Sequence, residues 1–242
     1  MKFTEGYWLL SERTNGQFAS QAYHIEAMEN GLRVVAPTSP VLSRGDTLNR
    51  PTITIEFLAV SPEVISVRAW HYEGYRTGEA RFEKKETTCD AVVTITENEA
   101  VLDAGRVSVH VDRKNWGYSF WADGKLLTSS GFHNLGYVRW DKRVSSMLPQ
   151  DNYMKEHEYT PYMTQDLLLA PGENVYGFGE RFTAFVKNGQ AVETWNEDGG
   201  TASQVAYKNI PFYMTNRGYG VFVDHTGNVS FEVASEKVEY VG

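Results

Sequence analysis

Cysteine is nearly missing from this sequence of 242 residues, in which Cys89 is the only one. A single cysteine cannot form a disulfide within the chain, so nothing here points to an oxidising compartment. No apolar run is close in length to a membrane-spanning helix, which requires about 18 residues. Residues 1–6 contain an early glutamate and no apolar stretch typical of a secretory signal. We therefore expect a cytoplasmic protein that makes no membrane contact.

Basic residues are too few and too scattered to bind a polyanion. The chain has 23 lysines and arginines against 31 aspartates and glutamates, which gives a formal net charge of −8. The longest basic cluster, Lys84-Lys85, has a glutamate on each side. Because phosphate binding requires clustered basic side chains, we expect no nucleic-acid partner. A neutral ligand such as a sugar is compatible with this charge.

Metal ligands and nucleophile motifs are also sparse. The six histidines stand at positions 24, 71, 110, 133, 157 and 225, and no pair has zinc-ligand spacing. The sequence contains no Gly-x-Ser-x-Gly motif in which a serine would act as nucleophile. Residues 177–182 read Gly-Phe-Gly-Glu-Arg-Phe, which lacks the third glycine of a dinucleotide-binding loop. The sequence therefore predicts no metal and no cofactor.

What the sequence does contain is alternation of apolar and polar residues with a period of two. This pattern is typical of half-buried strands, and it recurs at residues 52–57, 64–70, 92–96 and 107–111. Asp123-Gly124 between two β-prone runs predicts a hairpin with a type I′ turn. Further turns are predicted at residues 171–173 and 216–218. Residues 135–158 have weak patterning, and we interpret them as a long excursion.

This organisation predicts an all-β fold with few short helices. Many antiparallel strands joined by short turns favour a large sandwich of packed sheets. A (β/α)8 barrel would require strands that alternate with helices, and that alternation is absent. The strand-like residues 238–242 suggest that the chain is a piece of a longer polypeptide.

Residues 190–208 have the composition of a sugar-contacting loop. Trp195, Asn196 and Asp198 stand together and are followed by Gly199-Gly200. An aromatic ring can stack on the C–H face of a sugar, and Asn or Asp can bind neighbouring hydroxyls. The same residues are equally suited to a solvated turn. Composition alone leaves the two interpretations open.

Ordered motifs in this region resemble the N-terminal domain of glycoside hydrolase family 31, and in particular that of bacterial cytoplasmic α-xylosidases. Residues 175–182 read Val-Tyr-Gly-Phe-Gly-Glu-Arg-Phe, and residues 193–200 read Glu-Thr-Trp-Asn-Glu-Asp-Gly-Gly. The motifs run in order over about 60 residues and are completed by residues 188–190, 207–213, 216–221, 231–233 and 235–237. Residues 1–150 match more loosely.

The resemblance implies a single domain over residues 1–242, a large β-sandwich of the galactose mutarotase-like supersandwich type. It implies that a catalytic (β/α)8 barrel follows, with a catalytic nucleophile and a general acid that are two aspartates outside this chain. The loop at residues 195–200 would reach over the barrel mouth, where Asp198, Trp195 and Asn196 would bind substrate, although Trp195 could instead anchor the loop. We expect Glu180 and Arg181 to form an ion pair that braces this loop from behind rather than to contact the ligand.

The implied partners are an α-xyloside or α-glucoside oligosaccharide, the barrel of the same polypeptide, and other copies in a homo-oligomer. Three alternatives stay open at this point. The chain could be a stand-alone carbohydrate-binding module, the front domain of an α-glucosidase, or an epimerase related to aldose mutarotases. The last would require a histidine and a glutamate positioned in a groove of the sheet.

Overall fold

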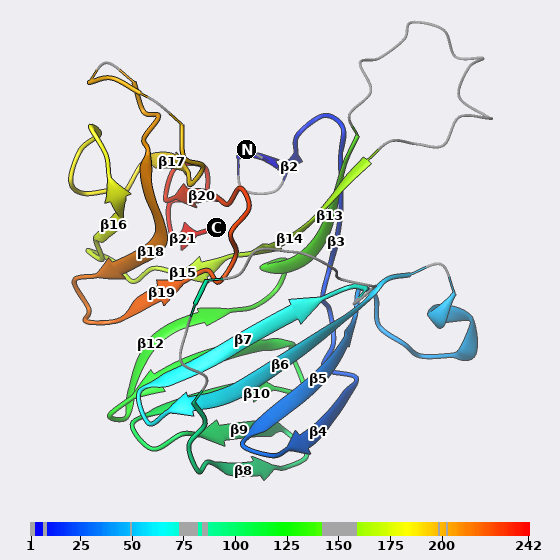
Figure 1. The fold of residues 1–242 in the computed structure, drawn as a ribbon. Helices are drawn as coiled ribbons and strands as arrows, with labels where there is room; N and C mark the ends of the chain where they lie inside the picture. The colour runs from blue at the N-terminus through cyan, green and yellow to red at the C-terminus, as the bar shows by residue number, and fades with distance from the viewer. Residues whose placement is uncertain are drawn as a thin grey trace, which may run out of the picture.

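The computed structural model describes residues 3–6, 9–48, 50–72, 82–83, 87–141, 159–197, 199–201 and 203–242. In these residues β-strands are joined by turns, and one short 3-10 helix, η1 (Arg44–Thr47), interrupts them. No helix of the described residues is long and apolar enough to cross a membrane. The predicted all-β fold is confirmed (Figure 1).

Two antiparallel sheets form the first sandwich, in the lower half of Figure 1. One sheet has the order β4 (His24–Met28), β5 (Gly31–Pro37), β6 (Thr52–Ser61) and β7 (Val64–Trp70). The other has the order β12 (Lys125–Ser130), β11 (Gly117–Ala122), β10 (Val107–Asp112), β9 (Glu99–Asp103) and β8 (Val92–Ile95). The predicted alternation at residues 52–57, 64–70, 92–96 and 107–111 therefore corresponds to β6, β7, β8 and β10.

The core of this sandwich contains the apolar residues of the alternating strands. Ile53, Ile55 and Phe57 of β6 are fully buried, and so are Val109 and Val111 of β10. Burial of each such side chain stabilises the fold by about 1.5–3 kcal/mol relative to exposure. The polar residues between them point to the opposite face, where Glu56 of β6 is covered by its ion pair with Arg33.

The predicted hairpin is confirmed between β11 and β12. Asp123 has φ 49° and Gly124 has φ 73°, so both central residues are in the left-handed region. A type I′ turn requires this conformation, and its twist matches that of the flanking strands.

Residues 135–158 were predicted as an excursion, and this prediction is partly wrong. Residues 135–141 form the strand β13 (Leu135–Asp141), which pairs with β3 (Thr14–Phe18) and β14 (Tyr159–Gln165). The alternation is obscured because Leu135 and Val138, which point to opposite faces, are both buried, while Gly136 leaves room for the Phe18 ring. Residues 142–158 lie outside the described residues.

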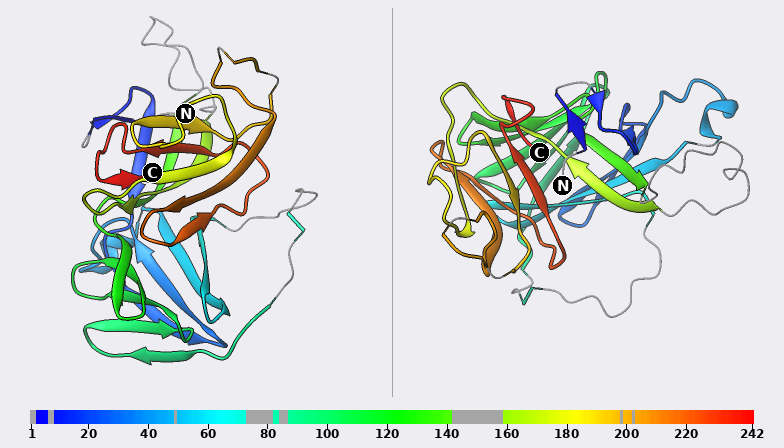
Figure 2. Two further views of the ribbon diagram at one scale, coloured as in Figure 1. Left: turned by 90° about the vertical axis from the view of Figure 1, so that its left-hand side faces the viewer. Right: turned by 90° about the horizontal axis from the view of Figure 1, so that it is seen from above.

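A second pair of sheets lies above the first sandwich (Figures 1 and 2). One sheet has the order β15 (Leu167–Leu168), β21 (Tyr240–Val241), β20 (Ser230–Val233) and β17 (Gln190–Glu193). The other has the order β16 (Val175–Glu180), β18 (Lys208–Thr215) and β19 (Gly220–Phe222). At the N-terminus, β1 (Thr4–Glu5) and β2 (Leu9–Leu10) form a short antiparallel hairpin.

These sheets enclose a hydrophobic cluster of their own. Its buried members include Val175, Phe178, Tyr213, Phe231 and Val233, whereas the first cluster draws on residues 19–135. The β-sandwich prediction thus holds, but the apolar residues divide into two cores. That residues 1–242 act as one domain stays a prediction.

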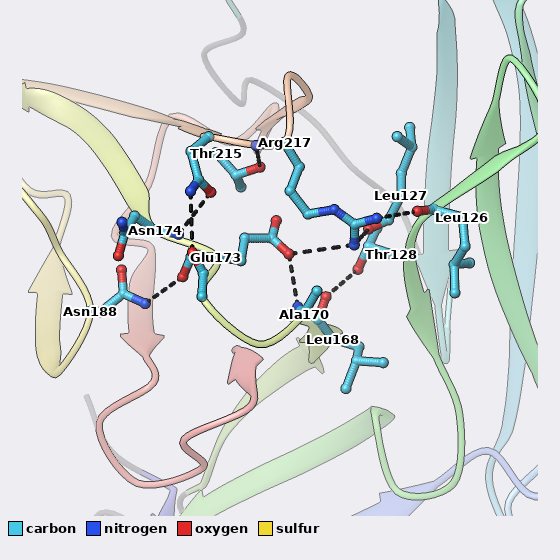
Figure 3. Close-up of polar contacts among 12 residues, drawn as sticks. Leu126, Leu127, Thr128, Leu168, Ala170, Glu173, Asn174, Asn188, Thr215 and Arg217 are labelled. Atoms are coloured by element: carbon cyan, nitrogen blue, oxygen red, sulfur yellow. Dashed lines mark hydrogen bonds and ion pairs between the residues drawn. The ribbon is translucent and has the colours of Figure 1, made fainter.

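A polar joint connects the two halves around Glu173 (Figure 3). The Glu173 side chain is fully buried, and its carboxylate accepts the Ala170 N–H at 2.8 Å. Arg217 lies 3.8 Å from the same oxygen, and it donates to the carbonyls of Leu126 and Leu127 on β12. Thr128 of β12 donates to the Leu168 carbonyl at 2.8 Å. The joint therefore holds the second half in a defined position on the first.

Candidate functional site

The Gly-Phe-Gly sequence of β16 brings this strand very close to β18. Gly177 and Gly179 have φ of 120° and 87°, and the strand register shifts between them. A Cβ on Gly177 would lie 2.7 Å from the Phe212 carbonyl oxygen, and one on Gly179 would overlap the Lys208 carbonyl oxygen. Only glycine fits two such positions. The bend directs Phe178 into the core, where its ring lies 4.7 Å from Phe231.

Arg181 follows this bend and reaches across to the candidate loop, which we define as residues 195–207. Its guanidinium donates to the carbonyls of Phe178 and Gln204 at 3.3 and 3.2 Å. It also donates to the Glu193 carbonyl and to Oδ1 of Asn209. Burial lowers the pKa of Arg181, although a guanidinium stays charged at neutral pH. Arg181 thus links β16 to both arms of the loop.

The predicted ion pair between Glu180 and Arg181 is not formed. Glu180 instead lies 3.1 Å from Nζ of Lys208, and both side chains are well exposed. The physical reason is that Glu180, the last residue of β16, lies opposite Lys208 of β18, whereas Arg181 lies just beyond the end of the strand. Glu180 therefore faces water, whereas Arg181 turns inward toward backbone carbonyls. An exposed pair of this kind contributes about 0–1 kcal/mol.

Asn209 is the centre of the loop neck, the point where residues 195–196 and 206–209 meet. Its side-chain Nδ2 lies 2.8 Å from the Trp195 carbonyl and 2.7 Å from the Ala206 carbonyl. Its backbone N–H donates to Oδ1 of Asn196 at 3.1 Å, and Asn196 forms a bridge with Ala206. Asn209 did not stand out in the sequence, where it reads as one polar residue of a strand.

The sequence predicts three residues that bind substrate, Trp195, Asn196 and Asp198, and the structure describes the first two. Trp195 is 53% exposed and leaves its ring available at the loop surface. Asn196 uses Oδ1 within the neck, so its role includes holding the loop. Asp198 lies outside the described residues, and its role as sugar ligand stays a prediction. Gly199 passes so close to the Val205 carbonyl that a side chain there would clash.

The described residues of this loop offer groups that can bind a sugar. Trp195 and Tyr207 offer exposed aromatic rings, and Asn196 is a neutral hydrogen-bonding group. No group of three or more His, Cys, Asp or Glu residues in the described part of the chain could hold a metal ion. Exposed aromatic rings beside a hydrogen-bonded neck can position a loop against a sugar that another surface holds.

A histidine–glutamate pair occurs elsewhere, on the outer face of β9 and β10. Nδ1 of His110 lies 2.8 Å from Glu99, and Nε2 lies 3.1 Å from the Ser108 hydroxyl. Near it, Arg106 pairs with Glu63 and Asp123 at 2.7 and 3.3 Å. These groups form a polar network on the outer face of the sheet. The epimerase alternative stays a hypothesis, and an assay of anomer interconversion would test it.

Comparison with known sequences identifies relatives over most of the chain. The family model described as "Glycosyl hydrolase 31 N-terminal galactose mutarotase-like domain" matches residues 53–232. Alpha-xylosidase XylQ of Lactiplantibacillus pentosus is 40% identical over 246 residues, which cover 100% of this chain and 30% of that protein. An alpha-xylosidase of Emericella nidulans is 35% identical and covers 100% of this chain and 32% of that protein. The chain thus spans about a third of the length of these curated relatives.

Solved structures share the fold at lower identity. The cycloalternan-forming enzyme from Listeria monocytogenes in complex with pentasaccharide substrate superposes with a TM-score of 0.69 at 15% identity, over 94% of this chain and 19% of that one. A GH31 alpha-xylosidase from a soil metagenome, complexed with xylose, gives a TM-score of 0.56 at 16% identity, over 90% of this chain and 30% of that one. Both structures extend far beyond the region that matches.

Proposed function

This chain belongs to the glycosyl hydrolase 31 N-terminal galactose mutarotase-like domain family, and on that basis we propose that it serves a retaining α-glycosidase as its non-catalytic front domain. The observation that carries this proposal is the 40% identity to an α-xylosidase over the whole chain, which covers only 30% of that relative. The remaining part of the polypeptide would supply the catalytic barrel.

The reaction that we propose for the full-length enzyme is hydrolysis of terminal α-xylosyl residues with retention of configuration. Retaining glycosidases use two carboxyl groups about 5–5.5 Å apart, one as nucleophile and one as acid and base. We place both on the barrel, outside this chain. The residues of this chain would bind and orient the sugar and exclude water from the edge of the site.

The candidate loop is the part of this chain that we assign to substrate. Its neck is held by Asn209 and Arg181, which fix both arms through six hydrogen bonds to Asn196 and to backbone carbonyls. A loop held in this way loses little conformational freedom when it contacts a ligand. Asp198 would accept hydrogen bonds from sugar hydroxyls, and Trp195 would stack on the ring.

Substrate preference is tested with the full-length enzyme and two aryl glycosides. We expect hydrolysis of the aryl α-xyloside with a higher kcat/KM than that of the aryl α-glucoside, because the two curated relatives that match the whole chain are α-xylosidases. A preference for the glucoside would show an α-glucosidase instead. Absence of hydrolysis of both compounds would contradict the proposed function.

Replacement of Asp198 with alanine in the full-length enzyme is expected to lower kcat/KM about ten- to a hundred-fold. A hydrogen bond to a charged group contributes about 1.5–3 kcal/mol, which corresponds to this loss. Glu197→Ala is the matched control, because it removes the same charge from the neighbouring position of the loop. Equal values for Asp198→Ala, Glu197→Ala and the unmodified enzyme would show that Asp198 does not reach the sugar.

A further inference from the structure

The sheet formed by β16, β18 and β19 has one buried face and one apolar exposed face. Along β18, Pro211, Tyr213 and Thr215 are buried and point toward the second core. Their neighbours Ile210, Phe212 and Met214 are 53%, 37% and 51% exposed. An antiparallel strand that faces water normally has polar residues at these alternate positions.

The apolar residues continue across the sheet on both sides of β18. Phe212 lies opposite Phe222 of β19, which is 46% exposed, and Met214 lies opposite Tyr176 of β16. The ring of Phe185, 78% exposed, lies 5.2 Å from Tyr176. We call this set the apolar strip: Tyr176, Phe185, Ile210, Phe212, Met214 and Phe222.

Part of the strip also borders a large groove between the two halves of the chain. Phe212, Phe222 and Phe82 line it together with residues of β7 and β14. Phe82 extends the strip, since its ring lies 5.3 Å from that of Phe222. The groove has a volume of about 2710 Å³. This volume is larger than the about 300–1,000 Å³ of pockets for small ligands.

The outer face of the first sandwich shows how a solvated sheet of this chain looks. On β10 the outward positions are Ser108, His110 and Asp112, which alternate with the buried Val109 and Val111. The strip has apolar residues where that face has polar ones. Extended exposed apolar surface of this kind is characteristic of protein interfaces.

We propose that the apolar strip is the surface on which the remainder of the glycosidase polypeptide packs. This inference rests on the proposed function, and it names the face of this chain that the catalytic part covers. The relatives support that occupant, because about two thirds of each lies outside the region matched by this chain.

The strip and the candidate loop are connected through β18. Lys208 and Asn209 begin this strand beside the loop neck, and Ile210, Phe212 and Met214 follow along it. A protein surface that covers the strip therefore lies next to Trp195, whose carbonyl Asn209 holds. Docking on the strip would set the position of the loop relative to the catalytic barrel.

Met214 is a natural probe for this interface, because exposed methionines are oxidised to the sulfoxide and buried ones are protected. We expect hydrogen peroxide to oxidise Met214 about tenfold more slowly in the full-length enzyme than in the isolated 242-residue chain. Met28, on the β4 strand far from the strip, is the internal reference in the same mass spectra. Equal oxidation of Met214 in both proteins would overturn the proposal.

A matched pair of substitutions provides an independent test. Met214→Glu and Val92→Glu each place a charge on an exposed strand position, 51% and 66% exposed in the isolated chain. Both variants should leave the melting temperature of the isolated chain almost unchanged. In the full-length enzyme, only Met214→Glu should lower the melting temperature and increase proteolysis between the two parts. Equal effects of the two variants on the full-length enzyme would contradict the assignment.

Two further results distinguish the alternatives. If the isolated chain forms a dimer by analytical ultracentrifugation and Met214→Glu abolishes it, a second copy is the occupant and the proposal is wrong.

Failure of the proposed function would give a different result. Protection of Met214 without glycoside hydrolysis would uphold the strip and reject the activity, whereas hydrolysis without protection would reject the strip alone.

Discussion

Replacing Gly179 with alanine is expected to destabilise the chain by about 3–5 kcal/mol, the sum of backbone strain and steric overlap. Gly179 has φ 87°, a backbone conformation that residues other than glycine rarely adopt. A methyl group there would overlap the Lys208 carbonyl oxygen and lie 3.0 Å from the Ile210 nitrogen. Since both atoms belong to the backbone of β18, neither can move without disturbing the pairing of the strands. Urea unfolding of the purified chain measures the loss.

Gly172→Ala is the matched control for this experiment. Gly172 has φ 78°, yet no heavy atom lies within 4 Å of the position that its Cβ would take. Its replacement therefore causes backbone strain alone, at a cost of about 1 kcal/mol. A similar loss of stability for both variants would show that the close approach of β16 and β18 is not what requires glycine at position 179.

The second large effect is expected at the polar joint. Replacement of Arg217 with methionine should cost about 3–5 kcal/mol, because a buried carboxylate then loses its cation. The Glu173 side chain is fully buried, and Arg217 is the cation beside it at 3.8 Å. The variant also removes the two hydrogen bonds that Arg217 donates to the carbonyls of Leu126 and Leu127 on β12. Urea unfolding followed by tryptophan fluorescence should show the loss.

Neutralising the carboxylate should recover part of this stability. In Glu173→Gln/Arg217→Met the amide oxygen can still accept the Ala170 N–H, and no buried charge remains. We expect the double variant to be more stable than Arg217→Met, by about 1–2 kcal/mol. A double variant less stable than Arg217→Met would mean that the Glu173 carboxylate does not depend on Arg217 for compensation.

The strands and hairpins of this fold could be predicted because they depend on short-range patterns. Period-two alternation located β6, β7, β8 and β10, and Asp123-Gly124 located the turn that the structure confirms. Where a strand is covered on both faces, the pattern disappears. Leu135 and Val138 of β13 are both buried, so the strand gave no alternation to detect.

The candidate site shows a different limit. Its residue types and order along the chain indicated a loop, but not the partners that hold it. The assumption that Glu180 would pair with Arg181 failed because Glu180 lies opposite Lys208 of β18, while Arg181, just after the strand, turns toward backbone carbonyls. Asn209 binds across 13 residues to Asn196 and across 28 residues to Arg181. Contacts at such sequence separation become visible only when the strands are placed in space.

The most direct test of the whole account is glycoside hydrolysis by the isolated chain. The chain of residues 1–242 and the full-length enzyme are assayed at equal molar concentration on an aryl α-xyloside, with circular dichroism as evidence that the isolated chain is folded. We predict turnover by the full-length enzyme and none above the buffer rate by the folded chain. Hydrolysis by the isolated chain that rises in proportion to its concentration would contradict the claim that its catalytic carboxylates lie elsewhere.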